Sequence, residues 1–448
     1  MLLKGPVLPS LLRFTVPILF SLFLQALYGA VDLWMVGIYA DKADVSAVTT
    51  GSQTLMIVNA LVIGLSVGVT ISLGQAIGRG RLDRAARLIG TALVLFSALG
   101  LILASVLFLA APTLTLWLNA PESAVIQTRE YIRICGAGAV FIVGFNLLSA
   151  IFTGLGDSRT PLLFVGVATV VNILADYTLI HIFSMGAQGA AYATILAQAL
   201  SVALALFIIG SHLPFSLCRH HVRFNAPLAA RIIKLGSPIA LQNACNEISY
   251  LLIIGFVNLL GVVASSGVGI AEKLVMFILL IPTAFMYAIS AFTAQNVGAG
   301  RLDRADQVLR LGLLCSGLIG AIAAYFSVFH GQAMASLFIH ERAVIADAAV
   351  FLKTTAIECF ILSLAYCFVG YFTGLGRTGW VLFQGMVAIF CVRIPYAYWA
   401  SHQSDPSLFN IGLSLAFAAA TMLIICSVLF VLLLKSRKPI NAAPMRTP

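Results

Sequence analysis

The stretch Gln75-Ala-Ile-Gly-Arg-Gly-Arg-Leu-Asp-Arg-Ala85 returns almost unchanged as Gln295-Asn-Val-Gly-Ala-Gly-Arg-Leu-Asp-Arg-Ala305, 220 positions further along the chain. A second pair repeats at the same offset, Phe152-Thr-Gly-Leu-Gly156 and Phe372-Thr-Gly-Leu-Gly376. Two motifs that share one offset indicate an internal duplication rather than chance matches in an apolar sequence. The 448 residues therefore form two copies of one unit.

The composition places the chain in a membrane. Charged residues make up 9% of the sequence and hydrophobic residues 61%, whereas soluble domains carry about 25% charged residues. The apolar runs are long and continuous, which is typical of helical spans and not of the alternating strands of a β-barrel. At about 20 residues per crossing, we count six spans per copy. They are residues 9–38, 45–77, 88–109, 131–153, 161–183, 190–209, 236–260, 263–291, 308–330, 349–370, 380–399 and 410–434.

This count predicts an all-α integral membrane protein with twelve transmembrane helices in two six-helix lobes. Because each copy has an even number of spans, both copies enter the membrane with the same polarity, and we expect a pseudo-twofold axis along the membrane normal. The expected parts are an N-terminal lobe (1–210), a cytoplasmic inter-lobe linker (211–234), a C-terminal lobe (235–434) and a basic cytoplasmic tail (435–448). Asp83 and Asp303 in the repeated loops are expected to cap the helices that follow.

The distribution of basic residues predicts the orientation. Most of the 26 Lys and Arg residues fall in the two ends and in the loops on the same side, so both termini are expected in the cytoplasm of a multi-pass protein of the cell (inner) membrane. The net charge of +10 is then loop charge, and no basic groove with interleaved aromatic residues indicates a nucleic-acid partner. We expect a monomer whose partners are the lipid bilayer and a small organic substrate.

The eight cysteines lie almost entirely in apolar spans, with no Cys-x-x-Cys pair and no histidine at ligand spacing. We interpret them as packing residues and expect no cofactor. An intramembrane enzyme is also disfavoured, because no His-Glu-x-x-His, Gly-x-Ser-x-Gly or paired-aspartate motif is present.

Polar residues inside the spans are the candidate functional residues, because a charge at the bilayer centre costs about 2.5 to 3.5 kcal/mol or more. In the first copy they fall on single helical faces, at spacings of three and four. They are Gln25, Tyr28 and Asp32 in the first span, Asn172 and Asp176 in the fifth, and Thr194, Gln198 and Ser201 in the sixth. No basic residue in these spans is available to neutralise the two acids. An unpaired buried carboxylate can take up a proton, and with a nearby amide and hydroxyl it can ligate sodium.

The second copy carries charges of both signs. Its candidates are Asn243, Glu247 and Tyr250 in the seventh span, the adjacent Glu272 and Lys273 in the eighth, Glu358 in the tenth and Arg393 in the eleventh. Each has a purely structural alternative. Gln25, Gln198, Ser201 and Asn243 can make packing bonds only, and for Glu247 and Lys273 an ion pair is favoured over a transport role. Arg393, just before Pro395, can extend its charged end to a membrane face.

The chain resembles the prokaryotic multidrug and toxic compound extrusion (MATE) transporters over essentially its whole length. The resemblance rests on Pro17, on the repeated Gly-x-Gly-Arg-Leu-Asp-Arg-Ala loops and on three span motifs. These motifs are Val31-Asp-Leu-Trp-Met-Val-Gly37, Asn172-Ile-Leu-Ala-Asp176 and Gly186-Ala-Gln-Gly-Ala-Ala-Tyr-Ala-Thr194.

The resemblance implies a coupling-cation site in the first lobe, made by Asp32, Asn172, Asp176 and Thr194 with Tyr131 close by. It also implies antiport, in which a proton or sodium ion enters as a drug-like, often cationic, organic compound leaves. One branch of the family uses further acids in spans seven and ten. Here Glu247 and Glu358 lie near those positions, and Leu362 stands where the second acid would be.

A second transport function remains open, namely a flippase for lipid-linked sugars or another amphiphile on the same two-lobe plan. Such proteins often have two extra spans or an arginine-rich cavity, and this chain offers only Lys273 and Arg393 for that role.

Overall fold

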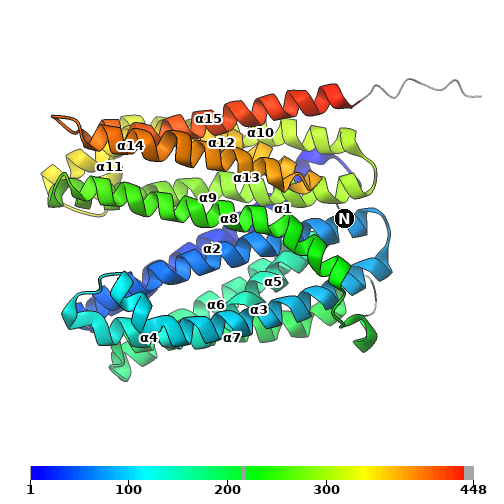
Figure 1. Cartoon of the computed structure of the whole chain (residues 1–448), viewed down its shortest axis with the longest axis horizontal. Helices are drawn as coiled ribbons and strands as arrows, with labels where there is room; N and C mark the ends of the chain where they lie inside the picture. The colour runs from blue at the N-terminus through cyan, green and yellow to red at the C-terminus, as the bar shows by residue number, and fades with distance from the viewer. Residues whose placement is uncertain (1, 214, 216, 438–448) are drawn as a thin grey trace, which may run out of the picture.

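The computed structural model describes residues 2–213, 215 and 217–437, and every regular element in this part of the chain is a helix (Figure 1). The first half contains α1 (Val7–Tyr39), α2 (Lys42–Gly78), α3 (Leu82–Trp117), α4 (Val125–Ala137), α5 (Ala139–Leu155), α6 (Arg159–Asp176) and α7 (Gly186–His212). The second half contains α8 (Ala226–Asn258), α9 (Val262–Gly298), α10 (Leu302–Phe329), α11 (Gly331–Ser336), α12 (Arg342–Leu375), α13 (Thr378–Met386), α14 (Ile394–Ser401) and α15 (Leu408–Ser436). Short 3₁₀ segments are η1 (Glu122–Ala124) and η3 (Arg219–His221), and π-helical segments are η2 (Tyr177–Ile182) and η4 (Val387–Arg393).

Eleven helices of the described chain are long and apolar enough to cross a membrane, and a bent pair provides the twelfth span. The pair joins Glu122–Ala137 to Ala139–Leu155 at an angle of 49°. The sequence predicted one span here, at residues 131–153. It is broken at Gly138, where a Cβ atom would lie 2.3 Å from the side chain of Ile195 on α7, so the chain bends where only glycine fits.

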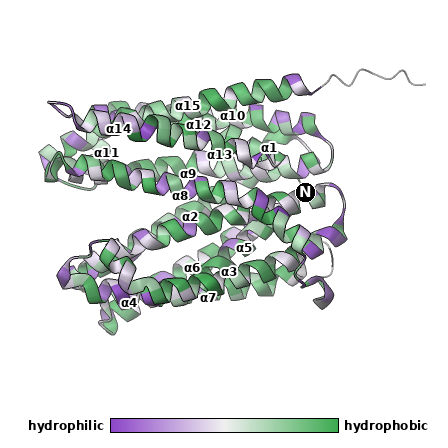
Figure 2. Ribbon diagram, in the orientation of Figure 1, coloured by the Kyte–Doolittle hydropathy of each residue, from purple (hydrophilic) through white to green (hydrophobic). Residues whose placement is uncertain are grey.

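Hydropathy follows the long axis of the bundle. Hydrophobic residues cover the middle of the helices, and hydrophilic residues gather toward the two ends (Figure 2). The N-terminus and the described end of α15 lie at the same end of the bundle (Figure 1), as an even number of crossings requires. This is a multi-pass membrane protein.

The two lobes meet through α1 and α2 of the first half and α8 and α9 of the second. Helix α2 packs along α8 at glycines: a Cβ atom at Gly64 would lie 2.2 Å from the Cα of Ala240, and one at Gly68 would lie 2.3 Å from the carbonyl oxygen of Ile232. Small residues at a four-residue spacing allow two backbones to approach closely in a membrane. The lobe interface therefore depends on these glycines.

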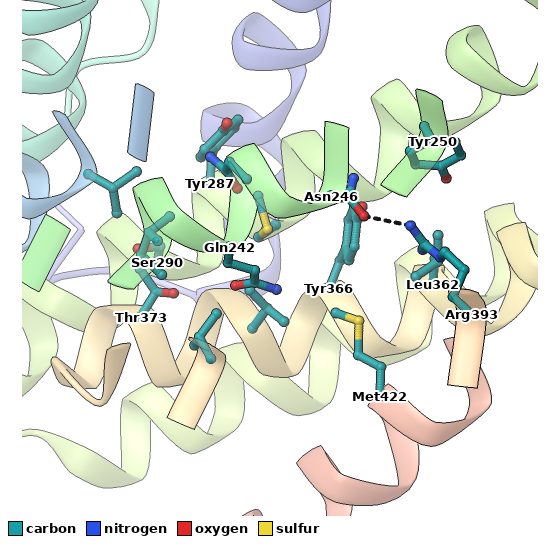
Figure 3. A pocket seen from close by; sticks show the side chains of 16 residues that line it. Gln242, Asn246, Tyr250, Tyr287, Ser290, Leu362, Tyr366, Thr373, Arg393 and Met422 are labelled. Carbon is teal, nitrogen blue, oxygen red and sulfur yellow. Dashed lines mark hydrogen bonds between the residues drawn. The ribbon is translucent and has the colours of Figure 1, made fainter. Parts of the chain in front are cut away.

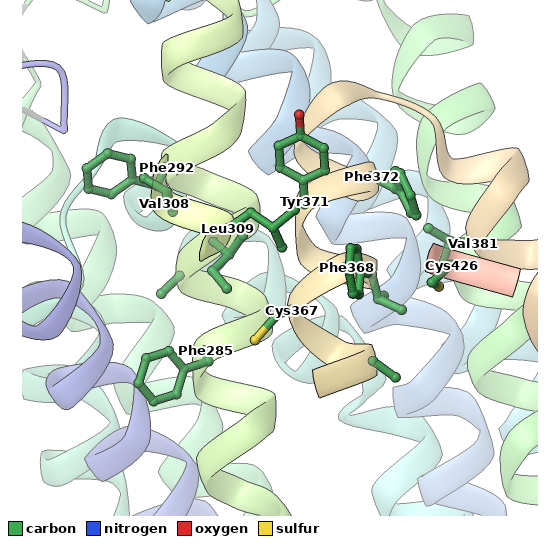
Figure 4. Packing of buried hydrophobic residues seen from close by; sticks show 14 of the residues in the cluster. Phe285, Phe292, Val308, Leu309, Cys367, Phe368, Tyr371, Phe372, Val381 and Cys426 are labelled. Carbon is green, nitrogen blue, oxygen red and sulfur yellow. The ribbon is translucent and has the colours of Figure 1, made fainter. Parts of the chain in front are cut away.

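Each lobe has its own apolar core. In the second lobe, α9, α10, α12 and α15 interlock aromatic and aliphatic side chains, among them Phe292, Leu309, Tyr371, Phe372 and Cys426 (Figure 4). All five are essentially inaccessible. Close packing of this kind holds these four helices together.

The prediction that aspartates cap the helices after the repeated loops is wrong. Neither Asp83 nor Asp303 caps a helix, because both lie within the first turn and the Asp83 carboxylate accepts a hydrogen bond from Arg87 instead. Helix α8 begins at Ala226, inside the predicted linker, because the Asn225 side chain accepts a hydrogen bond from the Leu228 amide at 3.2 Å. Most of the predicted tail, residues 438–448, lies outside the described residues.

Candidate functional site

Three helices of the first lobe bring the predicted cation residues together. Asp32 comes from the second half of α1, Asn172 and Asp176 from the end of α6, and Thr194 from α7. The Asp32 carboxyl lies next to Asp176, Asn172 and Thr194, and the Thr194 hydroxyl donates a hydrogen bond to Asp32 Oδ2 at 3.2 Å. Tyr131 on α4 is buried nearby, and its ring packs so closely on α2 that Gly51 has no room for a Cβ atom.

The acids of this cluster have few partners. Asn172 and Asp176 are 0% exposed and Asp32 is 8% exposed. One oxygen of Asp32, both oxygens of Asp176 and both amide atoms of Asn172 have no hydrogen-bond partner within the described chain. Neither the Asp32 nor the Asp176 carboxylate takes part in an ion pair with a described residue. Two adjacent carboxylates without a counter-charge are costly to bury. A shared proton or a bound cation on these oxygens would remove that cost.

The backbone around the cluster is shaped for it. Asp176 is the last residue of α6, and the chain continues as the π-helical turn η2; such turns are frequent at functional sites. The following helix is fastened by Asp44 of α2, whose Oδ1 accepts a hydrogen bond from the Ala187 amide at 3.0 Å. Gly186 precedes it at φ +52°, where a Cβ atom would lie 2.4 Å from Asp44 Oδ2. The absence of a side chain at Gly186 therefore lets Asp44 approach and hydrogen-bond the start of α7, the helix that carries Thr194.

The other predicted first-lobe residues flank the cluster. The Gln198 side chain donates a hydrogen bond to the Tyr28 hydroxyl at 3.4 Å and so joins α7 to α1 beside Asp32. Gln25 instead donates to the carbonyl of Ser21 on its own helix at 3.2 Å. Ser201 donates to the carbonyl of Phe164 at 3.0 Å. Of these two bonds, only that of Ser201 joins two helices, α7 and α6.

The second lobe contains a cavity of about 110 Å³, drawn in Figure 3. Its walls come from α8, α9, α12, α13, η4 and α15, and Val67 of α2 contributes from the first lobe. The chief polar lining residues are Gln242, Asn246, Tyr250, Tyr287, Tyr366 and Arg393. Of the residues predicted in this lobe, Asn243, Tyr250 and Arg393 line the cavity, whereas Glu247, Glu272, Lys273 and Glu358 do not.

Arg393 is buried in this wall, so the interpretation that it extends to a membrane face is wrong. It is only 6% exposed, because the turn η4 that carries it packs against both α8 and α15. Its Nη1 donates to Asn246 Oδ1 at 2.8 Å, and its guanidinium carbon lies 4.8 Å from the centre of the Tyr250 ring. The Tyr250 hydroxyl in turn donates to Glu358 Oε1 at 3.2 Å.

The expected ion pair between Glu247 and Lys273 is also wrong. Lys273 is exposed, and the half-buried Glu247 makes neither an ion pair nor a hydrogen bond with any described residue. Facing of two side chains on neighbouring helices depends on helix rotation, which a spacing pattern does not specify. Glu272 is partly buried and lies close enough to Glu358 for the two carboxyl groups to interact electrostatically.

Sequence reasoning missed most of the cavity lining. Gln242 and Asn246 precede Tyr250 by eight and four positions, so all three lie on one face of α8. The four-residue spacing of these three polar residues was a signal in the sequence, but the prediction named Asn243 and Glu247 of the same helix in place of Gln242 and Asn246. Tyr287, Tyr366 and Thr373 belong to spans without a regular polar stripe, and only their packing brings them to the cavity.

The interpretation of the cysteines as packing residues is wrong for Cys218, which is exposed and lies beside two histidines. Cys218, His220 and His221 have potential ligand atoms within 4.8 Å of one another. Both His221 nitrogens already face protein groups, since Nδ1 accepts from the Cys218 amide at 3.2 Å and Nε2 lies 3.6 Å from Asp83 Oδ1. The contact with Asp83 joins the inter-lobe connection to the first turn of α3.

Comparison with known proteins decides the family. The model of the MatE family matches residues 17–178 and again residues 238–399, one match in each lobe. The chain belongs to the MatE family of MATE transporters. The two matches correspond to the duplication that the repeated motifs indicated.

Curated MATE relatives align along most of this chain. "Probable multidrug resistance protein YpnP" of Bacillus subtilis is 28% identical over 92% of this chain and 93% of its own length. "Multidrug export protein MepA" of Staphylococcus aureus is 24% identical over 86% of each chain.

Solved MATE structures share the fold. One described as a MATE in the straight conformation superposes with a TM-score of 0.91 at 19% identity, over 97% of this chain and 98% of the other. One described as an outward-facing multidrug resistance MATE transporter has a TM-score of 0.90 at 19% identity, over 97% of both chains.

Proposed function

We propose that this MATE protein is a secondary active antiporter that exports drug-like, often cationic, organic compounds in exchange for protons or sodium. The observation that carries the proposal is the buried Asp32–Asp176 pair, which has no basic partner among the described residues. The names of the relatives, which refer to multidrug resistance and multidrug export, support the substrate class.

Coupling follows from the chemistry of the pair. With a proton or sodium ion bound, the cluster is neutral; without it, the two carboxylates repel each other. That difference acts on α1, which carries Asp32 and has Pro17 as a break in its hydrogen-bond ladder. If the ion and the drug bind different forms of α1, each drives the release of the other.

The transporter is proposed to reside in the cell (inner) membrane with both termini in the cytoplasm, to act as a monomer and to need no cofactor beyond its coupling ion. The loop charges that support this orientation include the three arginines of Arg79-Gly-Arg-Leu-Asp-Arg84.

Reconstitution in proteoliposomes tests the function directly. The purified chain is reconstituted with a fluorescent cationic dye, and a proton gradient or a sodium gradient is imposed separately. One of the two gradients is expected to drive dye against its concentration. Equal dye movement with and without either gradient would contradict antiport.

A further inference from the structure

Equivalent helices of the two lobes carry different charged residues. The two family matches pair α1 with α8 and α6 with α13–η4. In the first lobe these helices hold the carboxylates of Asp32 and Asp176. In the second lobe they hold Glu247 and Arg393, and of these two only Arg393 lines the cavity. The charge that these helices bring to the second-lobe cavity is therefore positive.

The described protein neighbours of Arg393 leave its positive charge without a counter-charge and part of its hydrogen-bonding capacity unused. Asn246 and the Tyr250 ring, its direct partners, are both neutral, and its Nε has no hydrogen-bond partner in the described chain. Arg393 and Glu358 do not form an ion pair within 4.0 Å; the described ion pairs lie elsewhere. A buried guanidinium with free donors is costly, and its planar fork matches a carboxylate.

Glu358 lies behind this arrangement. It is fully buried and does not line the cavity, and its contact with the site runs through the hydroxyl of Tyr250. The guanidinium carbon of Arg393 lies 4.8 Å from the centre of the same Tyr250 ring, and Figure 3 shows Arg393 beside Asn246 at this end of the cavity. The charged group that meets the cavity is therefore the cation.

The cavity's size and lining narrow the ligand further. About 110 Å³ is well below the roughly 300 Å³ or more of a site that encloses a drug-sized molecule, so it accepts one substituent. Tyr287 and Tyr366 supply aromatic faces, and Gln242 supplies an amide. Val67 of the first lobe completes the wall, so the cavity lies against the interface between the lobes.

We propose that this cavity binds the carboxylate of an aromatic compound, with Arg393 as its counter-charge. The proposal rests on the proposed export function for its physiological meaning. Binding itself needs no gradient and is measured separately.

The test uses the purified full chain in detergent and two probes, a rhodamine dye with a free carboxylate and the methyl ester of the same dye. Fluorescence anisotropy gives both dissociation constants. Arg393→Gln is expected to weaken binding of the carboxylate dye roughly 10- to 100-fold, and to change binding of the ester less than about twofold. The control is Arg342→Gln, at an exposed arginine that begins α12, which should change neither.

A second variant covers the case in which Arg393→Gln does not fold. Asn246→Asp keeps the acceptor for Arg393 Nη1 and places a competing carboxylate beside it. It should weaken the carboxylate dye selectively, as Arg393→Gln does. Equal losses for the two dyes, or no preference for the carboxylate dye over its ester in the wild type, would overturn the proposal. If the protein binds the carboxylate dye selectively but neither gradient drives dye transport in proteoliposomes, the binding site is supported and only the antiport proposal is overturned.

Discussion

Gln75 and Gln295 make reciprocal hydrogen bonds across the two lobes. The Gln75 amide donates to the carbonyl of Gly374 at 3.2 Å, and the Gln295 amide donates to the carbonyl of Gly154 at 3.0 Å. Donors and acceptors are both 220 positions apart, so each repeated loop contacts the Thr-Gly-Leu-Gly turn of the other copy. The repeated motifs that indicate the duplication therefore also supply hydrogen bonds between the two lobes.

Further contacts close the same end of the molecule. Arg231 of α8 donates to the Gln75 side chain at 2.6 Å, and the Leu2 amide donates to the Gln295 side chain at 3.3 Å. Arg304 holds the chain just after Leu2 by donating to the carbonyl of Gly5 at 2.8 Å. Both glutamines are buried. This end of the lobe interface is therefore sealed by polar contacts that can be broken and remade.

Replacing either glutamine should favour opening at this end. Gln75→Ala or Gln295→Ala removes a buried hydrogen bond and leaves a carbonyl without its donor, at a cost of about 1 to 3 kcal/mol. We expect faster alkylation of a cysteine placed at Ala294, which faces Gly74 in the interface, in a chain whose eight native cysteines are replaced. Gln403→Ala is the control, because Gln403 is exposed, lies just after α14 and donates to the carbonyl of Trp399. Unchanged labelling in a chain that carries both Gln75→Ala and Gln295→Ala would contradict the role of these contacts in closing this end.

The first-lobe acids should be indispensable for coupling. Asp32→Asn and Asp176→Asn keep the side-chain shape and lose the charge, so each is expected to abolish gradient-driven export. The measurement is dye efflux from cells that carry equal amounts of each variant in the membrane. Glu247→Gln, at an acid without a partner among the described residues, should stay near wild type. Wild-type efflux from Asp176→Asn would remove the cluster from the mechanism and direct attention to Glu272.

Glu358→Gln should retain at least part of the export activity. Glu358 lies in the second lobe, outside the Asp32–Asp176 cluster, and a glutamine oxygen can still accept the hydrogen bond from the Tyr250 hydroxyl. The same efflux assay measures the result at matched expression. Complete loss of export in a stable Glu358→Gln protein would show that the second lobe takes part in ion coupling.

Gly64→Ala should destabilise the folded protein. The new methyl group would overlap the backbone of α8, since a Cβ atom there lies 2.2 Å from the Cα of Ala240, and overpacking of this kind costs about 1 to 3 kcal/mol. We expect a lower midpoint of thermal unfolding in detergent. Gly269→Ala is the matched control, because nothing lies within 4 Å of its Cβ position. Equal midpoints for the two variants would mean that α2 and α8 can separate without loss.

The sequence alone determined the architecture and showed which polar residues lie in the apolar spans. A repeat at a constant offset and apolar runs of membrane length depend only on local composition, so they gave the two-lobe, twelve-span plan. Asp32, Asn172, Asp176 and Thr194 were recognisable because each is a polar residue in an apolar helix. A bilayer tolerates such residues only where they face each other, and the structure brings these four together.

Only the tertiary structure decided which second-lobe residues share a site. Asn246 and Arg393 are 147 positions apart, and Glu358 reaches the cavity only through Tyr250. These relationships depend on how α8, α12 and η4 are rotated against one another, and on the π-helical turn that carries Arg393 inward. A spacing pattern fixes a residue's face on its own helix. It leaves open which neighbour that face meets, because helix rotation is set by the packing of the whole lobe.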